Sequence, residues 1–243
     1  MIKVGIICPC PIEYKTCRNI LELSNETELA GRAVASKTSE DIDLMAIEAG
    51  PGKTQCASAT QLVIDNFQPD YVIDVGGAGA LSNELNINDI VCAKNAFEYD
   101  VYDIDKFLKW PSGLTTSTAL TRLLSSESGI IQEFTDWVAL HCSSRLVVGD
   151  IASGENIVSG GELRRDLRDK LGAIACNWET SAVLRTAQLN SVQAFSFRVI
   201  TDTADRNYKE QIKQNWEGAL KILYTVLKEF IHSGWLDRIS QVL

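Results

Sequence analysis

Short apolar, β-rich runs alternate with amphipathic helical stretches along nearly the whole chain, and this alternation limits the possible folds more than any other feature. Residues 2–8 read IKVGIIC, a run typical of a buried strand, and Pro11 suits the first turn of a following helix. Residues 30–37 and 42–49 predict a hairpin. Further strands are expected at 71–75, 89–93, 96–102, 145–151, 173–176 and 193–201, and further helices at 53–67, 116–125, 132–140, 159–171, 179–190 and 207–232. This order predicts an α/β fold with a central sheet flanked by helices.

No segment of the chain reads as a linker between two domains. The 243 residues contain no Pro-, Ser- or Gly-rich stretch and no run of charge that separates two halves. A chain of this length buries roughly 70% of the surface of its unfolded form and folds without disulfides or metals. We therefore expect one domain over residues 1–243. Within it, the Ser-x-x-Glu pattern that begins at Ser159 predicts a capped helix start.

The chain is acidic, with a formal net charge of −9. An acidic surface repels phosphate backbones and anionic lipid headgroups, so neither a nucleic acid nor a membrane is expected as a partner. The seven cysteines are an odd number, and the amino terminus begins a strand-like run rather than a signal peptide. No run reaches the ~20 apolar residues of a membrane span. These features favour reduced thiols and a cytoplasmic protein.

Two glycine-rich segments are candidates for ligand contact. Residues 52–54 read GKT, like the end of a phosphate-binding P-loop, but Ile47 stands where that motif requires a glycine, which argues against a nucleotide triphosphatase. Residues 76–80 read GGAGA and follow a predicted strand, yet Ser82 takes the place of the last glycine of a dinucleotide-binding motif. A sharp turn and a close approach of the backbone to a ligand explain this second segment equally well.

The sequence offers little for metal or covalent catalysis. His141 and His232 are the only histidines, and neither has a second ligand at zinc spacing. Cys8 and Cys10 are too close together for a C-x-x-C redox site, and no G-x-S-x-G motif provides a nucleophilic serine. We expect neither a metal nor a cofactor.

Three carboxylates follow predicted strands. Glu13 comes after the first strand, Glu179 after the strand at 173–176, and Asp202 after the last strand. Ligands bind at the carboxyl ends of strands in open α/β sheets, because the loops there face one crevice. Any one of these acids is more readily a helix cap or a surface charge. Three of them beside two glycine-rich segments favour a site.

These residues also carry a resemblance to a known family. The matching segments follow one order from residue 4 to about residue 205: Val4-Gly5-Ile6-Ile7 with Glu13, Ala49-Gly50-Pro51-Gly52-Lys53, Val75-Gly76-Gly77-Ala78-Gly79-Ala80, Asn88-Asp89-Ile90-Val91, Ser153-Gly154-Glu155-Asn156-Ile157, Asn177-Trp178-Glu179-Thr180 and Arg198-Val199-Ile200-Thr201-Asp202. The chain resembles the nucleoside phosphorylase superfamily and is most similar to the 5′-methylthioadenosine/S-adenosylhomocysteine nucleosidases. The resemblance implies a purine nucleoside phosphorylase-like fold, in which a central, mixed, twisted sheet lies between helices in three layers.

The resemblance implies catalytic roles for three residues. Cleavage of an N-glycosidic bond passes through an oxocarbenium-like state, and the leaving purine must be neutralised. Asp202 is then the general acid that protonates purine N7, and Glu13 is the general base for the attacking water. Arg198 helps to hold that water. Glu179 accepts hydrogen bonds from the 2′- and 3′-hydroxyls of the ribose.

The resemblance also implies a set of substrate contacts. Backbone groups around Ile157 and Val158 read the purine edge, and Trp178 covers the ribose face or, nearly as readily, anchors the core. The other residues of the expected substrate site are Gly77, Ala78, Gly79, Asn156 and Thr201. Residues 97–115 are aromatic-rich and form either a specificity loop or an ordinary surface excursion.

The expected reaction is hydrolysis of a purine nucleoside of the methylthioadenosine or S-adenosylhomocysteine type, with release of adenine. Phosphorolysis needs cations and a hydroxyl to hold a phosphate dianion. Gly77 stands where relatives carry a serine, Glu13 is a poor neighbour for phosphate, and Arg18 and Arg32 are the nearest cationic candidates. A purine nucleoside or methylthioadenosine phosphorylase, a futalosine hydrolase and a non-catalytic nucleoside-binding protein remain alternatives. The resemblance implies a homodimer.

Overall fold

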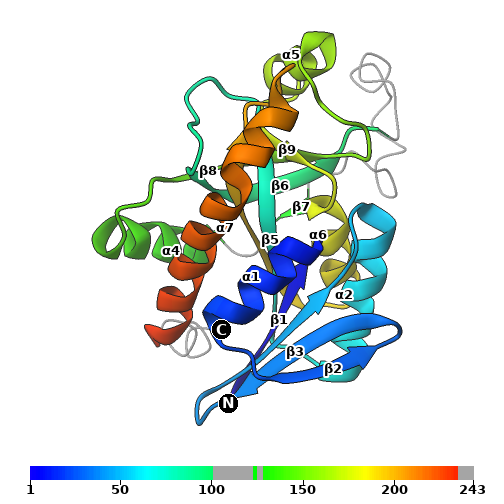
Figure 1. Ribbon diagram of the computed structural model, residues 1–243, viewed down its shortest axis with the longest axis vertical. Helices are drawn as coiled ribbons and strands as arrows, with labels where there is room; N and C mark the ends of the chain where they lie inside the picture. The colour runs from blue at the N-terminus through cyan, green and yellow to red at the C-terminus, as the bar shows by residue number, and fades with distance from the viewer. Residues whose placement is uncertain (101–122, 125–127, 235–243) are drawn as a thin grey trace.

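The ten strands that the computed structural model describes pair into one sheet, which has helices on both faces (Figure 1). The structure describes residues 1–100, 123–124 and 128–234. The strands are β1 (Ile2–Cys8), β2 (Asn25–Leu29), β3 (Arg32–Thr38), β4 (Ile42–Glu48), β5 (Tyr71–Ala80), β6 (Ile90–Glu98), β7 (Leu123–Leu124), β8 (Leu146–Ser153), β9 (Ala173–Asn177) and β10 (Gln193–Asp202). The helices are α1 (Pro11–Leu21), α2 (Lys53–Phe67), α4 (Ser128–His141), α5 (Gly161–Asp169), α6 (Thr180–Leu189) and α7 (Tyr208–His232).

Five of the strands close on themselves. The sheet follows the order β10, β6, β8, β9, β5, β1, β4, β3, β2, and β10 pairs in addition with β5. The strands β5, β10, β6, β8 and β9 therefore form a ring, from which β1, β4, β3 and β2 extend as an open sheet. β1 runs parallel to β4 and β5, whereas β10 is antiparallel to β6 and β5 is antiparallel to β9. The sheet is thus mixed, as expected.

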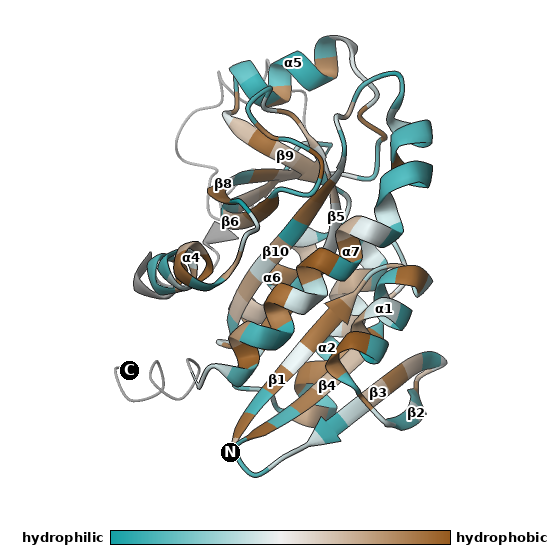
Figure 2. Cartoon of the chain, turned by 60° about the vertical axis from the view of Figure 1, so that its left-hand side comes forward, coloured by the Kyte–Doolittle hydropathy of each residue, from teal (hydrophilic) through white to brown (hydrophobic). Residues whose placement is uncertain are grey.

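The alternation of side chains along β1 accounts for the layers. Ile6 packs in a cluster with α1 and α7, whereas its neighbour Ile7 packs in a second cluster with α2 and α6. Successive residues of a strand point to opposite faces of the sheet, so a strand covered on both sides needs apolar residues at every position. Figure 2 shows hydrophobic colour along β1, β4 and α7, while α5 is largely hydrophilic. The α/β class and the three-layer arrangement are confirmed.

The carboxyl ends of three strands meet at one edge of the sheet. β1, β5 and β10 run parallel, and the register pairs Gly79 near the end of β5 with Asp202 at the end of β10. β9 runs against β5 and pairs Cys176 with Gly79, so the residues after β9 reach the same edge. The segments that follow β1, β9 and β10 therefore converge, as the placement of the three carboxylates predicts.

Several predicted strands differ from the observed ones. β1 and α2 have the predicted bounds, but β5 continues past residue 75 to Ala80 because it pairs with β10 and β9 along the glycine-rich segment. The two strands expected at 89–93 and 96–102 are one strand, β6, whose register with β8 shifts between Ala93 and Ala96. The sequence does not predict β2, which is exposed along most of its length and has no apolar alternation.

One helix prediction is wrong at its start, and another can be compared with the structure at two residues only. α5 has Gly160 as its N-cap residue and no side-chain hydrogen bond there, so Ser159 does not form the expected capping box. The helix expected at 116–125 lies outside the described residues except for Leu123 and Leu124, which form β7 instead. β7 is antiparallel to β6 and depends on that long-range pairing rather than on its own sequence.

α7 is the longest described helix, with 25 residues. It has one apolar stripe, which is buried at Leu220, Leu223 and Leu227, because residues three and four apart share one face of a helix. Within the part of the chain that the structure describes, no helix is both long and apolar enough to cross a membrane.

Candidate active site

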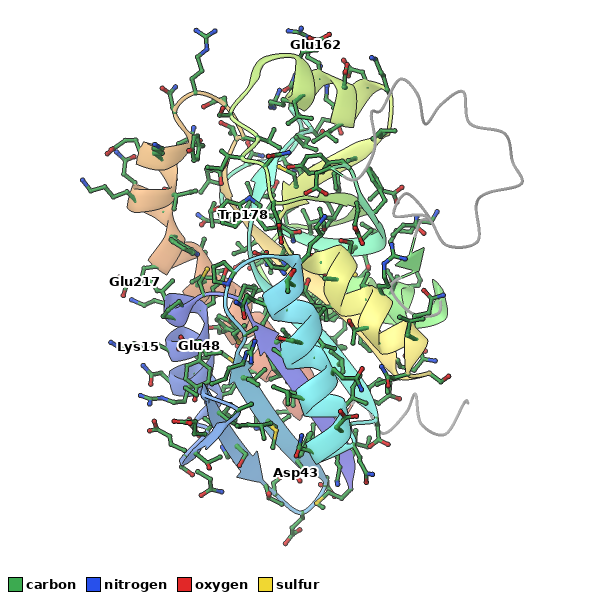
Figure 3. The ribbon with its side chains drawn as sticks, turned by 90° about the vertical axis from the view of Figure 1, so that its right-hand side faces the viewer. Lys15, Asp43, Glu48, Glu162, Trp178 and Glu217 are labelled. Carbon is green, nitrogen blue, oxygen red and sulfur yellow. The ribbon has the colours of Figure 1, made fainter. Side chains whose placement is uncertain are left out.

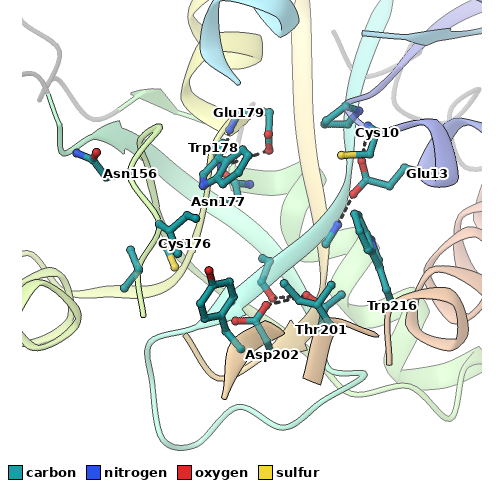
Figure 4. Close-up of a pocket in the computed structure, with 18 of the residues that line it drawn as sticks. Cys10, Glu13, Asn156, Cys176, Asn177, Trp178, Glu179, Thr201, Asp202 and Trp216 are labelled. Carbon is teal, nitrogen blue, oxygen red and sulfur yellow. Dashed lines mark hydrogen bonds between the residues drawn. The ribbon is translucent and has the colours of Figure 1, made fainter. Parts of the chain in front are cut away.

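A cavity of about 170 Å³ opens where β5, β9 and β10 end (Figure 4). Trp178 at the cavity is 37% exposed and lies above α2 in Figure 3. The lining residues are Pro9, Cys10, Glu13, Gly77, Ala78, Gly79, Tyr99, Asn156, Ile157, Val158, Cys176, Asn177, Trp178, Glu179, Thr201, Asp202, Tyr208, Ile212 and Trp216.

Glu13 lies in the first turn of α1 and is 3% exposed. Its Oε2 accepts a hydrogen bond from the N–H of Cys10 at 2.8 Å, and its Oε1 accepts one from the N–H of Gly77 at 2.9 Å. Burial raises the pKa of Glu13, whereas the charge of Arg198 and these N–H donors oppose the rise. The carboxylate is therefore held in one position at the cavity wall.

Arg198 on β10 anchors a buried cluster of charges. Its Nε donates to Oδ2 of Asp74 at 3.0 Å and its Nη2 donates to Oδ1, so the pair is bidentate. Its Nη1 donates to Oε2 of Glu179 at 3.5 Å and to the carbonyl oxygen of Gly77 at 3.4 Å. Burial lowers the pKa of Arg198, but its carboxylate neighbours, Asp74 first, raise it by more. The guanidinium lies behind the cavity wall rather than on it.

Asp74 is a functional residue that the sequence analysis misses. It is fully buried in β5, and its Oδ2 also accepts hydrogen bonds from the hydroxyls of Thr180 and Ser196, both at 2.7 Å. A buried charge persists only with such partners. The signal in the sequence is the single acid inside the apolar run YVIDV at residues 71–75, which requires a cationic partner elsewhere in the chain.

Glu179 is 6% exposed and is held by two backbone N–H groups. The N–H of Gly52 donates to Oε1 at 3.2 Å, and the N–H of Trp178 donates to Oε2 at 3.3 Å. Burial raises the pKa of Glu179 to about 7, although the charge of Arg198 opposes the rise. Gly52 is the N-cap of α2, so the N-terminus of this helix holds a carboxylate.

Asp202 lies at the end of β10 and is 6% exposed. Its Oδ1 accepts a hydrogen bond from the N–H of Ala204 at 2.9 Å, and its Oδ2 accepts one from the hydroxyl of Thr201 at 3.0 Å. Burial raises the pKa of Asp202, and these two hydrogen bonds oppose the rise. The carboxyl therefore keeps a proton to a higher pH than an exposed aspartate does.

The glycines of β5 let the strand pass close to both carboxyls. A Cβ atom on Gly76 would lie 2.4 Å from Oε1 of Glu13, and a Cβ atom on Gly79 would lie 2.9 Å from Oδ1 of Asp202. Ala78, between them, is buried and lines the cavity. Of the two explanations left open by the sequence, the sharp turn is wrong, because the strand continues. The other explanation, a close approach of the backbone to a ligand, stays a prediction.

Residues 154–158 form one rim of the cavity. Tyr99 donates its hydroxyl to the carbonyl oxygen of Asn156 at 2.5 Å. Ile157 is 49% exposed, whereas Val158 is buried. Tyr99 thus holds the backbone of this segment, while the side chain of Ile157 remains open to solvent.

The same segment is tied to the N-terminus of α2. The N–H of Lys53 donates to Oε1 of Glu155 at 3.0 Å, and the N–H of Glu155 donates to Oδ2 of Asp100 at 2.8 Å. The ammonium of Lys53 pairs with Asp100 at 2.5 Å and with Glu98 at 3.4 Å. Two successive N–H groups of one helix end therefore hold two segments of the cavity wall.

The structure brings the predicted site residues together in one cavity, except for Arg198. The analysis of the sequence misses the aromatic and apolar face that α7 presents to the cavity through Tyr208, Ile212 and Trp216. Their spacing of four residues puts them on one helix face, and the same stripe continues into the core at Leu220 and Leu223. Residues 101–115 of the expected specificity loop lie outside the described residues. Within the described part, no three His, Cys, Asp or Glu side chains gather as metal ligands.

Comparison with known proteins identifies relatives over almost the whole chain. The family described as the phosphorylase superfamily matches residues 3–232. The 5′-methylthioadenosine/S-adenosylhomocysteine nucleosidase of Bacillus pumilus is 25% identical over 225 residues, which cover 90% of this chain and 93% of that protein. The nucleosidase of the same name from Haemophilus ducreyi is 24% identical over 94% of this chain and 99% of its own.

Two solved structures show the same fold. The Helicobacter pylori 5′-methylthioadenosine/S-adenosylhomocysteine nucleosidase with butyl-thio-DADMe-Immucillin-A has a TM-score of 0.86 at 23% identity, covering 96% of this chain and 99% of that one. The native futalosine hydrolase of Helicobacter pylori has a TM-score of 0.86 at 24% identity, covering 96% and 98%. These findings confirm the resemblance and the fold expected from the sequence.

Proposed function

The chain belongs to the phosphorylase superfamily, and from this premise we propose that it is an N-ribosyl hydrolase. Its proposed substrates are 5′-modified adenosines of the 5′-methylthioadenosine or S-adenosylhomocysteine type, on which the nucleosidases similar to it are named. The observation that carries the proposal is that Glu13, Glu179 and Asp202 line one cavity. Each carries a carboxyl that is at least nine-tenths buried.

In the proposed mechanism, water attacks C1′ of the ribose and gives its proton to Glu13. The electron pair of the bond between C1′ and N9 leaves with the adenine, and Asp202 delivers a proton to N7. Burial supports the second role, because a raised pKa increases the fraction of Asp202 that carries a proton to give. The products are adenine and the 5′-modified ribose, so the atoms and protons balance.

Glu179 is the proposed ribose clamp. As a carboxylate it accepts the 2′- and 3′-hydroxyls, while the N–H groups of Gly52 and Trp178 fix its position. Arg198 supports this role by pairing with Glu179 from behind the wall. Arg198 does not line the cavity, so we propose that it helps to hold the water indirectly, through its hydrogen bond to the carbonyl oxygen of Gly77. Ile157 and Val158 are proposed to read the purine edge.

Hydrolysis is favoured over phosphorolysis by the charges around the cavity. Within the described part of the chain, no lysine or arginine lines it. Arg18 pairs with Glu26 at 2.7 Å, and Arg32 donates to the carbonyl oxygen of Ala49 at 3.1 Å, so both early arginines are engaged elsewhere. A phosphate dianion in a desolvated site needs such cations, whereas a water molecule does not.

A futalosine hydrolase is the second candidate, because the Helicobacter pylori enzyme of that name has a TM-score of 0.86 to this chain. It shares the proposed bond cleavage and differs in the base released. A non-catalytic nucleoside-binding protein is disfavoured, because binding alone does not require the buried acid Asp202. We further propose a cytoplasmic homodimer that acts in methionine salvage.

The decisive experiment is release of adenine from 5′-methylthioadenosine by the purified protein, first with phosphate rigorously absent and then with phosphate added. Release without phosphate, with free methylthioribose as the second product, supports the hydrolase. A sugar 1-phosphate formed only with phosphate present identifies a phosphorylase. Release of the base from futalosine, with no reaction of methylthioadenosine, identifies the second candidate. No release from either substrate, with measurable nucleoside binding, identifies a binding protein.

A further inference from the structure

Trp216 brings an unused hydrogen-bond donor to the cavity. Trp216 lies on α7, about two turns after Tyr208 and about one turn after Ile212. Figure 4 shows it between Glu13 and Thr201. Among the described residues, none accepts a hydrogen bond from its indole Nε1–H. A partly buried indole N–H normally finds an acceptor. The donor therefore points to an acceptor that binds in the cavity.

Gly77 has no side chain and therefore leaves space beside this donor. A Cβ atom on Gly77 would lie 3.5 Å from Nε1 of Trp216 and 3.0 Å from Cγ2 of Thr201. Any longer side chain at this position would reach into the space beside the indole edge. The glycine thus leaves room that the indole N–H faces, while its own N–H donates to Glu13 at 2.9 Å.

The indole is held rigidly, which makes it suitable for positioning a small ligand. Trp216 packs against the core cluster that contains Leu220 and Leu223 of the same helix. Its neighbour Asn215 donates to the carbonyl oxygen of Thr201 at 3.4 Å, which ties the helix to the end of β10. A side chain fixed in this way loses little conformational freedom when a ligand binds.

The hydrogen-bonding groups of Glu13 and Trp216 determine which kind of ligand fits between them. Beside Gly77 the cavity offers one carboxylate acceptor, Glu13, and one unpaired neutral donor, Nε1–H of Trp216, and no lysine or arginine is among the described residues that line it. A molecule that both donates and accepts satisfies the two groups at once, and water is the smallest such molecule. A phosphate dianion would meet the carboxylate with a single neutral donor, which is unfavourable.

We propose that Trp216 positions the attacking water, whose oxygen accepts from the indole Nε1–H while one of its hydrogens is donated to Glu13. This inference rests on the proposed hydrolase function. It assigns to Trp216 and Gly77 together the selection of water over larger nucleophiles. The proton of the attacking water still passes to Glu13, and the indole N–H gives up no proton.

The test compares Trp216→Phe with wild type in water and in water–methanol mixtures. Phenylalanine keeps an apolar ring and removes the donor, so kcat falls about tenfold with KM within about twofold, the cost of one hydrogen bond. Methanol competes with water for C1′, and the ratio of methyl riboside to free sugar rises in the variant because the water is no longer held. Trp137→Phe, which alters a partly buried tryptophan outside the cavity lining, is the matched control and leaves this ratio unchanged.

Each outcome decides between the alternatives. A lower kcat with an unchanged product ratio, or a higher KM alone, assigns Trp216 to packing or sugar binding and overturns the inference. Unchanged kcat and ratio overturn it as well. If wild type releases no purine, the proposed function fails first and the inference fails with it. Should Trp216→Phe not fold, judged by circular dichroism, Gly77→Ala tests the same space and is expected to lower kcat without raising KM.

Discussion

Burial raises the pKa of Asp202, and in the proposed mechanism its proton neutralises the leaving purine. Asp202→Asn preserves the shape of the side chain but removes the acid, so kcat is expected to fall about 10³-fold. Adenine binding, measured by calorimetry, is expected to change by less than about threefold. Asp205→Asn, which alters a neighbouring carboxyl outside the cavity lining, is the matched control. Turnover that survives intact in Asp202→Asn removes this residue from the mechanism.

Glu179 makes the activity depend on pH near neutrality. Its pKa is raised to about 7 by burial, and only the carboxylate accepts both ribose hydroxyls. We expect kcat/KM to fall about tenfold per pH unit below about pH 7, and Glu179→Gln to flatten this limb of the profile. The prediction fails if the acidic limb persists in Glu179→Gln. The contribution of Glu179 to the free energy of unfolding changes with pH in the opposite direction to its contribution to activity. A carboxyl whose pKa is raised in the folded state favours that state when it is protonated. This contribution is present below the ordinary pKa of 4.5 and is lost as the pH rises through about 7.

At the scale of elements, the N-terminus of α2 organises the cavity wall. The N–H groups of Gly52 and Lys53 hold Glu179 and Glu155, respectively. Glu155→Ala releases the segment 154–158 from the helix, so KM is expected to rise about fivefold while kcat stays within about twofold. Steady-state kinetics with Glu162→Ala, an exposed acid on α5, provide the comparison. A KM equal to that of wild type would show that the segment is positioned without this contact.

The elements that the sequence predicts well are those whose signal is local. The run IKVGIIC and the helix of residues 53–67 carry their own periodicity, so their bounds agree with the structure. β5 is predicted to stop at Val75 because glycines usually end strands. It continues because it pairs with β10 and β9, and Gly76 and Gly79 stand in it because Glu13 and Asp202 leave no room for a Cβ atom. That reason lies in residues far away along the chain.

The candidate site divides in the same way. Glu13, Glu179 and Asp202 are found from the sequence because each follows a strand, and strand ends converge in this class of fold. Asp74 and Trp216 are missed. The partner of Asp74 is Arg198 on another strand, and Trp216 continues a stripe that is otherwise core. Only the folded chain reveals which end of that stripe faces the cavity.

At the scale of the whole molecule, the ring of strands joins the first and last parts of the chain. β5 belongs both to the ring and to the open sheet, and α7 packs on the cluster that contains residues of β1 and β10. We propose that residues 1–243 form one domain, and we expect a single unfolding transition in urea. Circular dichroism and tryptophan fluorescence should give the same midpoint. Two separate midpoints, one for the ring and one for the open sheet, would contradict a single domain.

The closure of the ring is also what no local pattern predicts. β10 pairs with β5 over nine residue pairs and with β6 over three, although more than a hundred residues separate these partners in sequence. Such pairings depend on where neighbouring layers leave room rather than on the residues of either strand alone. The family resemblance predicts the general fold, whereas the ring of strands is seen only in the structure.

The open sheet ends at β2, and this has a consequence for the protein at high concentration. An unpaired strand edge is a template on which another copy can add its own strand. β2 reads NETEL, with Glu26 and Glu28 both exposed along that edge. Two copies that met edge to edge would bring these carboxylates together on a molecule that already carries a net charge of −9. β2, the strand that the sequence does not predict, therefore carries the negative charge that opposes edge-to-edge association of copies into fibrils.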